Sequence, residues 1–257
     1  MRVANPPATF ITIPLSHYCE KARWALDRVS LPYLEEPHVP LLSRFVARRA
    51  AGGTVPVLIH GNLRLTESSD ILRHADSMQP GVLYPLDAVP RAEVEAMEER
   101  FDTDLGTHVR RWAYTHLLPD KTLLRDLWSR GVPRREAVWL PLIVPIARKL
   151  LRRAYKVTPA GAVRSGDRIR EVFVDVAARL KDGRRFLAGD EFTAADLTFA
   201  ALAAPAVFAP ECRAVLPTLA QVPAAMREDV MALRATEAGQ FALRLYATER
   251  AFRQPAG

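Results

Sequence analysis

Two residues with reactive side chains follow a short hydrophobic run near the start of the chain. Ser16 and Cys19 stand at Ser-x-x-Cys spacing, just after residues 9–13 and Pro14. A helix that begins after Ser16 presents free N–H groups and the positive end of its dipole, where a thiolate is stabilised. Ser16 is therefore placed to serve a bound thiol, or only to cap the helix as serine commonly does.

Cys19 offers a different chemistry at the same place. A dithiol–disulfide cycle needs two sulfur atoms, so Ser16 and Cys19 cannot carry one between them. Cys19 could still form a mixed disulfide. It could equally be a small buried hydrophobic residue, since it lies one turn into the predicted helix on the apolar face. Cys212 has no such context, and we expect it to be inert.

The elements that would position these residues alternate between strand and helix. Runs of β-branched and aromatic residues predict strands, and apolar residues at helical spacing predict helices. The strands are expected at residues 9–13, 32–34, 55–59 and 63–65, and the helices at residues 18–29, 40–51 and 67–76. The predicted order is β-α-β-α-β-β-α.

A different pattern begins after a segment rich in proline and glycine, residues 81–90, which we interpret as a linker. No strand pattern continues beyond it. Long helices are expected at residues 91–118, 164–181, 194–207 and 224–250. The sequence therefore predicts a small α/β domain over residues 1–80 and an all-helical domain over residues 91–257.

Three motifs, in this order, resemble those of the glutathione transferases. SHYCEKARWALD at 16–27 resembles the entry to their first helix, and TVPVL at 54–58 with LTESSDI at 65–71 resembles the rest of their glutathione-binding half. FLAGDEFTAADL at 186–197 is similar to their C-terminal helical signature. The resemblance implies a thioredoxin-like first domain, an all-α second domain and glutathione as co-substrate. His17 departs from the proline often found after the catalytic position, which leaves the class open.

The resemblance also implies roles for the first two motifs. Ser16 donates a hydroxyl hydrogen bond to the sulfur of glutathione, or Cys19 forms a mixed disulfide with glutathione. Pro56 follows a cis peptide bond, so that the backbone of Val55 pairs with the cysteinyl backbone of glutathione like an added strand.

The charged ends of glutathione need further partners. By the same resemblance Glu67 faces the γ-glutamyl amine, and Ser68 at a helix N-terminus binds the γ-glutamyl carboxylate. Both could instead be ordinary first-turn residues. A cation is needed for the glycine carboxylate, and Arg48 or Arg49 is placed to supply it, although both could simply be solvated.

Thr193 and Asp196 have the spacing of a capping box, with Phe192 and Leu197 as the matching hydrophobic pair. We assign this element to folding and give it no catalytic role.

A face of the long helix after the linker is a candidate for binding the second substrate. His108, Arg111, Trp112 and Thr115 are three or four residues apart, which places them on one side of a helix. An aromatic and basic stripe suits an apolar electrophile that carries a negative charge, but it could equally be packing surface.

Composition excludes several classes of protein. Two cysteines exclude a disulfide-stapled scaffold and a multi-cysteine metal site. A hydrophobic content of 49% with 25% charged residues argues against disorder. No secretory signal is visible in residues 1–8, and no apolar stretch reaches the roughly 18 residues of a membrane-spanning helix.

The surplus of positive charge is local. The chain carries +7 in total, and residues 148–170 alone hold eight basic residues against one acidic residue. They follow ten uncharged residues, 138–147. Peripheral membrane contact through 138–170 is one interpretation, but we favour a buried helix followed by a solvated face. Nucleic-acid binding is not expected, because no recognition motif accompanies the charge.

We therefore expect a glutathione transferase-like enzyme that activates glutathione as a thiolate for attack on an electrophilic carbon or a peroxide. The alternatives are a Cys19-dependent thiol transferase or deglutathionylating enzyme, and a non-catalytic relative that docks through its basic segment. The resemblance also implies a homodimer, a cytoplasmic location and a role in detoxification, without a metal.

Overall fold

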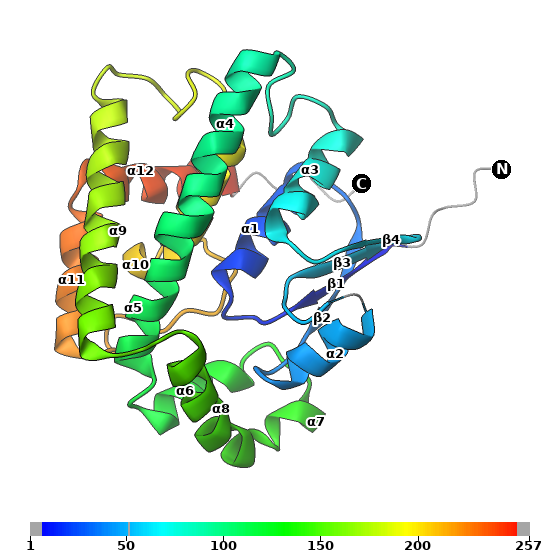
Figure 1. The fold of residues 1–257 in the computed structure, drawn as a ribbon, viewed down its shortest axis with the longest axis vertical. Coiled ribbons are helices and arrows are strands. Elements are labelled where there is room, and N and C mark those ends of the chain that lie inside the picture. The colour runs from blue at the N-terminus through cyan, green and yellow to red at the C-terminus, as the bar shows by residue number, and fades with distance from the viewer. Residues whose placement is uncertain (1–6, 51, 251–257) are drawn as a thin grey trace.

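A four-stranded mixed sheet forms the first part of the protein, and helices form the rest (Figure 1). The computed structural model describes residues 7–50 and 52–250. The strands are β1 (Ala8–Thr12), β2 (Tyr33–Pro37), β3 (Val57–His60) and β4 (Leu63–Leu65). Their order is β2-β1-β3-β4, with β1 and β2 parallel and the other pairs antiparallel. The predicted α/β class of this part is confirmed.

Helices cover both faces of the sheet, and the strand alternation explains which residues meet them. Successive side chains of a strand point to opposite faces. Phe10 belongs to the main core together with residues of α1 (His17–Arg28) and α3 (Ser68–Met78). Its neighbour Ile11 packs with Ala47 of α2 (Leu42–Ala50) on the other face. The turn from β1 into α1 is thus held between the helices α1 and α3 on one face of the sheet and α2 on the other.

The helical part is built around one central helix. In α10 (Ala194–Val207) every residue is buried, and it contacts α1, α4 and α12. The helices around it are α4 (Ala88–Arg100), the π-helical segment Phe101–Gly106, α5 (Thr107–Leu117), α9 (Pro159–Leu180), α11 (Ala224–Arg234), α12 (Glu237–Leu245) and the π-helical segment Tyr246–Arg250. α6 (Lys121–Ser129), α7 (Arg134–Ala137) and α8 (Leu140–Ala154) lie between α5 and α9 in the chain and at one end of the molecule (Figure 1). The predicted all-helical second part is confirmed.

Several predicted helix boundaries need correction. The helix expected from residue 91 begins at Ala88, inside the expected linker, and the one expected from residue 164 begins at Pro159. Proline fits a first turn, because its missing N–H has no intrahelical partner there. The helix expected over 224–250 is divided before Thr236, whose side chain accepts a hydrogen bond from the Gly239 amide and starts α12.

A buried lysine joins the sheet-containing part to the helical part. Lys21 of α1 is fully buried, and its ammonium lies 2.9 Å from a carboxylate oxygen of Glu98 and 2.6 Å from one of Asp102. It also donates to the hydroxyl of Ser69 at 3.0 Å. One charged cluster thus joins residues of α1, α3, α4 and the π-helical segment that follows α4. This cluster holds α1 at a fixed position against the helical part.

The start of α10 has the expected hydrogen-bonded cap. The Asp196 carboxylate accepts from the Thr193 amide and the Thr193 hydroxyl, each at 2.9 Å, and from the Leu187 amide at 2.7 Å. Phe192 and Leu197 are buried beside it. Burial raises the pKa of Asp196 to about 6. These contacts tie the preceding loop to the central helix.

The favoured interpretation of residues 138–147, a buried helix, is wrong for six of the ten side chains, which are exposed. Leu140, Val144 and Ala147 are buried, but Leu142 is 63% exposed and Ile146 is 58% exposed. Two of the residues between them, Pro141 and Pro145, lie within α8. The apolar run therefore has one face in the core and one face in solvent, because residues three or four apart share a side of a helix and only one side of α8 meets the core.

Candidate functional site

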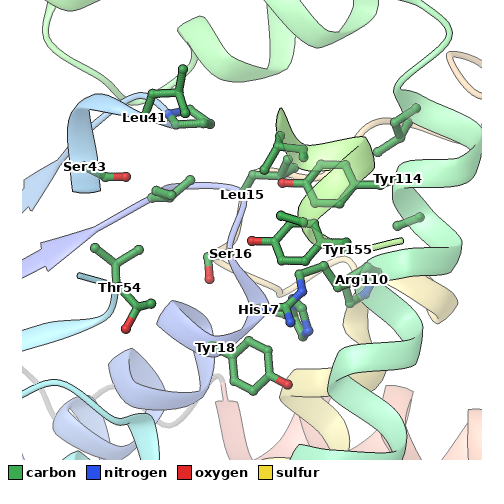
Figure 2. A pocket seen from close by; sticks show the side chains of 18 of the residues that line it. Leu15, Ser16, His17, Tyr18, Leu41, Ser43, Thr54, Arg110, Tyr114 and Tyr155 are labelled. Carbon is green, nitrogen blue, oxygen red and sulfur yellow. The ribbon is translucent and has the colours of Figure 1, made fainter. Parts of the chain in front are cut away.

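A cavity of about 330 Å³ lies between the sheet-containing part and the helical part. Its walls come from four places, shown in part in Figure 2: the β1–α1 turn, α2 with the loop before β3, α5, and the end of α8 with the segments after α10. Ser16 lies on the β1–α1 side of this cavity and Arg110 and Tyr114 lie on the α5 side. The described lining contains no aspartate or glutamate.

Ser16 combines the two roles that its sequence position allowed. It is the N-cap of α1, and its hydroxyl oxygen accepts a hydrogen bond from the Cys19 amide at 3.3 Å. It also lines the cavity. Among the described contacts its hydroxyl hydrogen has no acceptor, and the amides of His17 and Tyr18 have none either. The start of α1 therefore presents hydrogen-bond donors and the positive end of the helix dipole to the cavity.

Cys19 lies behind Ser16, away from the cavity. Its side chain is fully buried, and it is absent from the residues that line the cavity. Burial raises the pKa of its thiol. A buried thiol with a raised pKa is a poor nucleophile, because the thiolate is the reactive form. Cys212 is also a free cysteine with a pKa raised by burial, to about 12.

The loop before β3 brings the TVPVL motif to the cavity. Gly53, Thr54 and Val55 line it, and the peptide bond between Val55 and Pro56 is cis. Val55 and Ser16 therefore line the same cavity.

The residues expected to hold the charged ends of glutathione lie outside the cavity lining. Glu67 is the exposed N-cap residue of α3 without a side-chain capping bond, and Ser68 is buried in the first turn. Arg48 and Arg49 are exposed in the last turn of α2. None of these four lines the cavity.

Two neighbouring residues of α2, which the sequence did not single out, do line the cavity. Arg44 is exposed and makes no hydrogen bond or ion pair with any described residue. The Ser43 hydroxyl is buried without a partner. The signal that could have found them is position: both lie in the first turn of α2, close to the β1–α1 turn, whereas Arg48 and Arg49 lie a turn further on.

The expected substrate-binding face of the long helix points elsewhere. His108, Arg111, Trp112 and Thr115 are absent from the cavity lining. Arg111 donates to the Tyr155 carbonyl at 2.9 Å and to the Ser165 hydroxyl at 3.0 Å. The Trp112 indole is buried and donates to Asp229 of α11 at 3.0 Å. These residues pack α5 against its helical neighbours.

The face of α5 that lines the cavity carries Arg110, Ala113, Tyr114 and Leu117. The signal in the sequence was the apolar spacing of Leu105, Val109 and Trp112, which marks the core side of the helix. The residues one position after this core stripe, Arg110 and Ala113, then fall on the cavity side.

Arg110 sits among aromatic rings. Its guanidinium carbon lies 4.2 Å from the ring centre of Tyr155 and 5.5 Å from that of Tyr18. The Tyr155 ring is also stacked on Tyr114, with ring centres 5.6 Å apart and planes 7° apart. His17 donates from Nε2 to the Gly106 carbonyl at 3.0 Å, and burial with the nearby Arg110 charge lowers its pKa to about 3. His17 is therefore neutral at ordinary pH.

The described residues were also compared with the requirements of a metal site and of a membrane-spanning helix. Within residues 7–50 and 52–250, no group of three or more His, Cys, Asp or Glu side chains is arranged to hold a metal ion. In the same described ranges, none of the helices combines the length and the apolar character needed to cross a bilayer.

Comparison with known proteins agrees with the geometry. Residues 10–82 match the family model of the glutathione S-transferase N-terminal domain. No curated protein matches the sequence significantly. Among solved structures, the glutathione S-transferase CsGST63524 of Ceriporiopsis subvermispora, crystallised with glutathione, is 16% identical with a TM-score of 0.62, over 97% of this chain and 99% of that one.

Two other solved structures extend this fold comparison. The glutathione transferase GSTFuA3 of Phanerochaete chrysosporium is 15% identical with a TM-score of 0.61, over 96% of this chain and 98% of that one. Poplar glutathione transferase F1 is 18% identical with a TM-score of 0.54, over 94% and 98%. The sheet-containing part thus matches the family model of the glutathione S-transferase N-terminal domain, and the chain shares the fold of glutathione transferases along its length.

Proposed function

We propose that the protein is a glutathione transferase that binds glutathione with its sulfur at the start of α1 and activates it as a thiolate. The observation that carries this proposal is the position of Ser16, which caps α1 and faces the cavity with its hydroxyl hydrogen free of any described acceptor. The hydroxyl would donate to the sulfur, and the free amides of α1 would add to the stabilisation of negative charge.

The reaction that follows needs no other protein nucleophile. The thiol proton leaves to solvent, and the thiolate attacks an electrophilic carbon in the cavity, so that a C–S bond forms as the leaving group departs with its electron pair. With a peroxide, the thiolate takes one oxygen as the O–O bond breaks, and an alcohol or water is released. A second glutathione then reduces the resulting sulfenic acid, giving the disulfide and water.

Binding of the rest of glutathione is assigned to residues near that sulfur position. The backbone of Val55 would pair with the cysteinyl backbone. Arg44 and Ser43 offer a cation and an unpartnered buried hydroxyl for the glycine carboxylate, and in this proposal they replace Arg49. Glu67 and Ser68 keep their proposed place at the γ-glutamyl end, at the N-terminus of α3. Crystallised relatives with bound glutathione support the choice of ligand.

The Cys19-dependent alternatives have less support. Thiol transfer or deglutathionylation requires an accessible thiolate, and the Cys19 thiol is fully buried with a raised pKa. A non-catalytic relative would share the fold without binding glutathione. Homodimer formation, a cytoplasmic location and a role in detoxification remain predictions of the family resemblance. The two domains, with their boundaries at residues 80 and 91, remain a prediction from the sequence pattern.

Isothermal titration calorimetry combined with two variants tests the proposal. We expect wild type to bind glutathione, Ser16→Ala to lose conjugating activity, and Cys19→Ala to keep it. Loss of activity only in Cys19→Ala would establish the thiol-transferase alternative. Absence of glutathione binding by the wild-type protein would establish the non-catalytic one.

A further inference from the structure

Arg110 is a cation that lacks an anionic partner in the described structure. Arg110 is half-buried, and the two described arginines that are buried both have carboxylate partners: Arg23 binds Glu35, and Arg250 binds Glu20. Arg110 makes no hydrogen bond or ion pair with any described residue, and its buried Nε has no acceptor. Removing a guanidinium from water without a counter-ion is costly, so a ligand that supplies an anion would be stabilised there.

The surroundings of Arg110 keep it at the cavity wall. Tyr155 lies under the guanidinium at 4.2 Å, and Tyr18 lies at 5.5 Å with its hydroxyl donating to the Asp102 carbonyl at 2.9 Å. Figure 2 shows Arg110 beside His17 and close to both tyrosines. Cation–π contacts of this kind orient a guanidinium but leave its N–H groups available for an acceptor.

The cavity has a second unpaired cation on its opposite wall. Arg44 belongs to α2 and Arg110 to α5, and the described lining offers no carboxylate to either. The proposed function uses one of them: Arg44 lies on the side of the Val55 loop, where the glycine carboxylate of glutathione would lie. Arg110 is therefore available to bind a negatively charged group of the second substrate.

The rest of the α5 wall is apolar and aromatic. Tyr114 and Tyr155 are stacked in parallel, and Leu117, Leu151 and Phe208 also line the cavity. Flat ring faces and aliphatic side chains favour a planar apolar body over a sugar or a peptide.

From these contacts we infer that the second substrate is an aromatic electrophile bearing a carboxylate or sulfonate, with its anionic group on Arg110. The inference rests on the proposed function only for the identity of the attacking thiolate. With a chloronitrobenzoate, the sulfur forms a bond to the ring carbon that carried chlorine, chloride leaves with the bonding electrons, and the thiol proton goes to solvent.

Ligand binding without glutathione tests the inference separately from catalysis. Calorimetry would compare naphthalene-2-carboxylate with its neutral primary amide, on wild type, Arg110→Gln, Arg110→Lys and Arg44→Gln. We expect wild type to bind the carboxylate roughly tenfold or more tightly than the amide, as a charge-assisted hydrogen bond of about 1.5–3 kcal/mol implies. Arg110→Gln should bind both equally, Arg110→Lys should keep part of the preference, and Arg44→Gln should keep it all.

Two results would overturn the assignment: no preference in wild type, or an unchanged preference in Arg110→Gln. A preference lost in Arg44→Gln but kept in Arg110→Gln would move the anion site to α2. Catalysis adds a second readout, because 4-chloro-3-nitrobenzoate should be favoured over 4-chloro-3-nitrobenzamide in wild type and not in Arg110→Gln. If glutathione binding fails altogether, the calorimetric comparison still decides the anion site.

A separate observation concerns the exposed face of α7 and α8. Val138 is 69% exposed and Trp139 57%, and the same face continues through Leu142, Ile146 and Leu150 at helical spacing. The exposed side chains of Lys149, Arg152 and Arg153 follow on the last turns of α8, and none forms an ion pair with a described residue. From residue 137 to residue 166 the sequence contains no aspartate or glutamate.

We propose that this face, defined by Val138, Trp139, Leu142, Ile146, Leu150 and the three basic residues, docks on an anionic phospholipid membrane. Apolar side chains beside a row of cations match the acyl boundary and the anionic headgroups. A second copy of the chain fits poorly, because a two-fold interface would bring the same cations together. α8 lies at the outer edge of the molecule (Figure 1), where a flat surface can reach it.

Vesicle binding followed by tryptophan fluorescence tests this surface. Trp139 is exposed while Trp24, Trp112 and Trp128 are buried, so a blue shift would report on Trp139. We expect binding to phosphatidylcholine vesicles that contain phosphatidylglycerol and not to phosphatidylcholine alone, with loss in Leu142→Ser/Ile146→Ser. Val174→Ser, at an equally exposed apolar residue of α9, should bind as wild type does.

Equal binding to both vesicle types, or unchanged binding by the double variant, would overturn the membrane assignment. So would a wild-type dimer that dissociates in the double variant while vesicle binding is absent, since that result would make the face an interface between two copies.

Discussion

The amide of Cys19 donates to the hydroxyl oxygen of Ser16, 3.3 Å away, and this bond separates the two candidate residues of the first motif. It makes Ser16 the cap at the mouth of the cavity and fixes Cys19 one turn inside the core. Ser16 can therefore contact a ligand, while Cys19 can reach one only if α1 moves.

Substitution of Ser16 should affect catalysis far more than stability. Ser16→Ala removes the proposed hydrogen bond to the sulfur, and loss of one such donor costs on the order of 10²-fold in kcat. The lost cap costs about 1 kcal/mol in the free energy of unfolding. Steady-state kinetics and urea denaturation measure the two effects. Ser16→Thr, which keeps a hydroxyl, should retain much of the activity; equal inactivation of both variants by unfolding would argue against a chemical role.

Two of the arginines of α2, Arg44 and Arg49, should differ in their effect on glutathione binding. Arg44→Gln removes a cation from the cavity wall and should raise KM for glutathione roughly tenfold, because hydrogen bonds to charged groups contribute about 1.5–3 kcal/mol. Arg49→Gln changes an exposed residue away from the cavity and serves as the matched control. The same KM for both variants would remove Arg44 from the binding site.

Lys21 should be among the most costly residues to replace. Lys21→Met leaves the carboxylates of Glu98 and Asp102 buried without their shared cation, which typically costs about 3–5 kcal/mol. Chemical denaturation measures the loss. Arg73→Gln, which breaks an exposed pair with Asp70, should change stability by less than about 1 kcal/mol. A small effect at Lys21 would mean that the cluster is open to water in solution.

The buried imidazole of His17 should make stability fall as the solution becomes acidic. Its pKa is lowered from 6.5 to about 3, so the folded state holds it neutral while the unfolded chain takes up a proton. The contribution of His17 is therefore complete above about pH 6.5 and decreases as the pH falls toward 3. Comparing the pH dependence of unfolding in wild type and His17→Asn isolates it. Identical pH profiles would show that His17 is not buried as described.

The cap of α10 should matter for folding and not for ligand binding. Thr193→Ala removes the hydroxyl that donates to Asp196 and should lower stability by roughly 1 kcal/mol. Thermal denaturation and glutathione titration measure the two quantities. A variant of normal stability that no longer bound glutathione would contradict the structural assignment.

The strands, helices and caps that depend on local sequence patterns could be predicted from the sequence. The features that depend on tertiary packing could not. The run of β-branched and aromatic residues at 9–13 was enough to predict the first strand, and the spacing of Thr193 and Asp196 was enough to predict the α10 cap. The orientation of α5 about its own axis could not be predicted in this way. Residues three or four apart share a face, but only packing decides whether that face meets Asp229 or the cavity.

The burial of the apolar residues 138–147, before the basic segment, also could not be predicted from the sequence. Ten uncharged residues are typical of a buried helix, yet α8 leaves Leu142 and Ile146 in solvent. Hydrophobicity by itself gives no period, so it could not show that a second element covers only one side of this helix. Arg44 was missed for a related reason, since nothing in its residue type distinguishes it from Arg48 and Arg49 one turn later.

The ionisation of bound glutathione tests the central claim most directly. Ultraviolet absorbance of the thiolate, titrated against pH in the binary complex, gives the pKa of the bound thiol without any second substrate. We expect a pKa at least one unit below the roughly 8.5 of a free thiol in wild type and in Cys19→Ala, and a value returned toward 8.5 in Ser16→Ala. An unshifted thiol in wild type, or a shift that survives in Ser16→Ala, would contradict it.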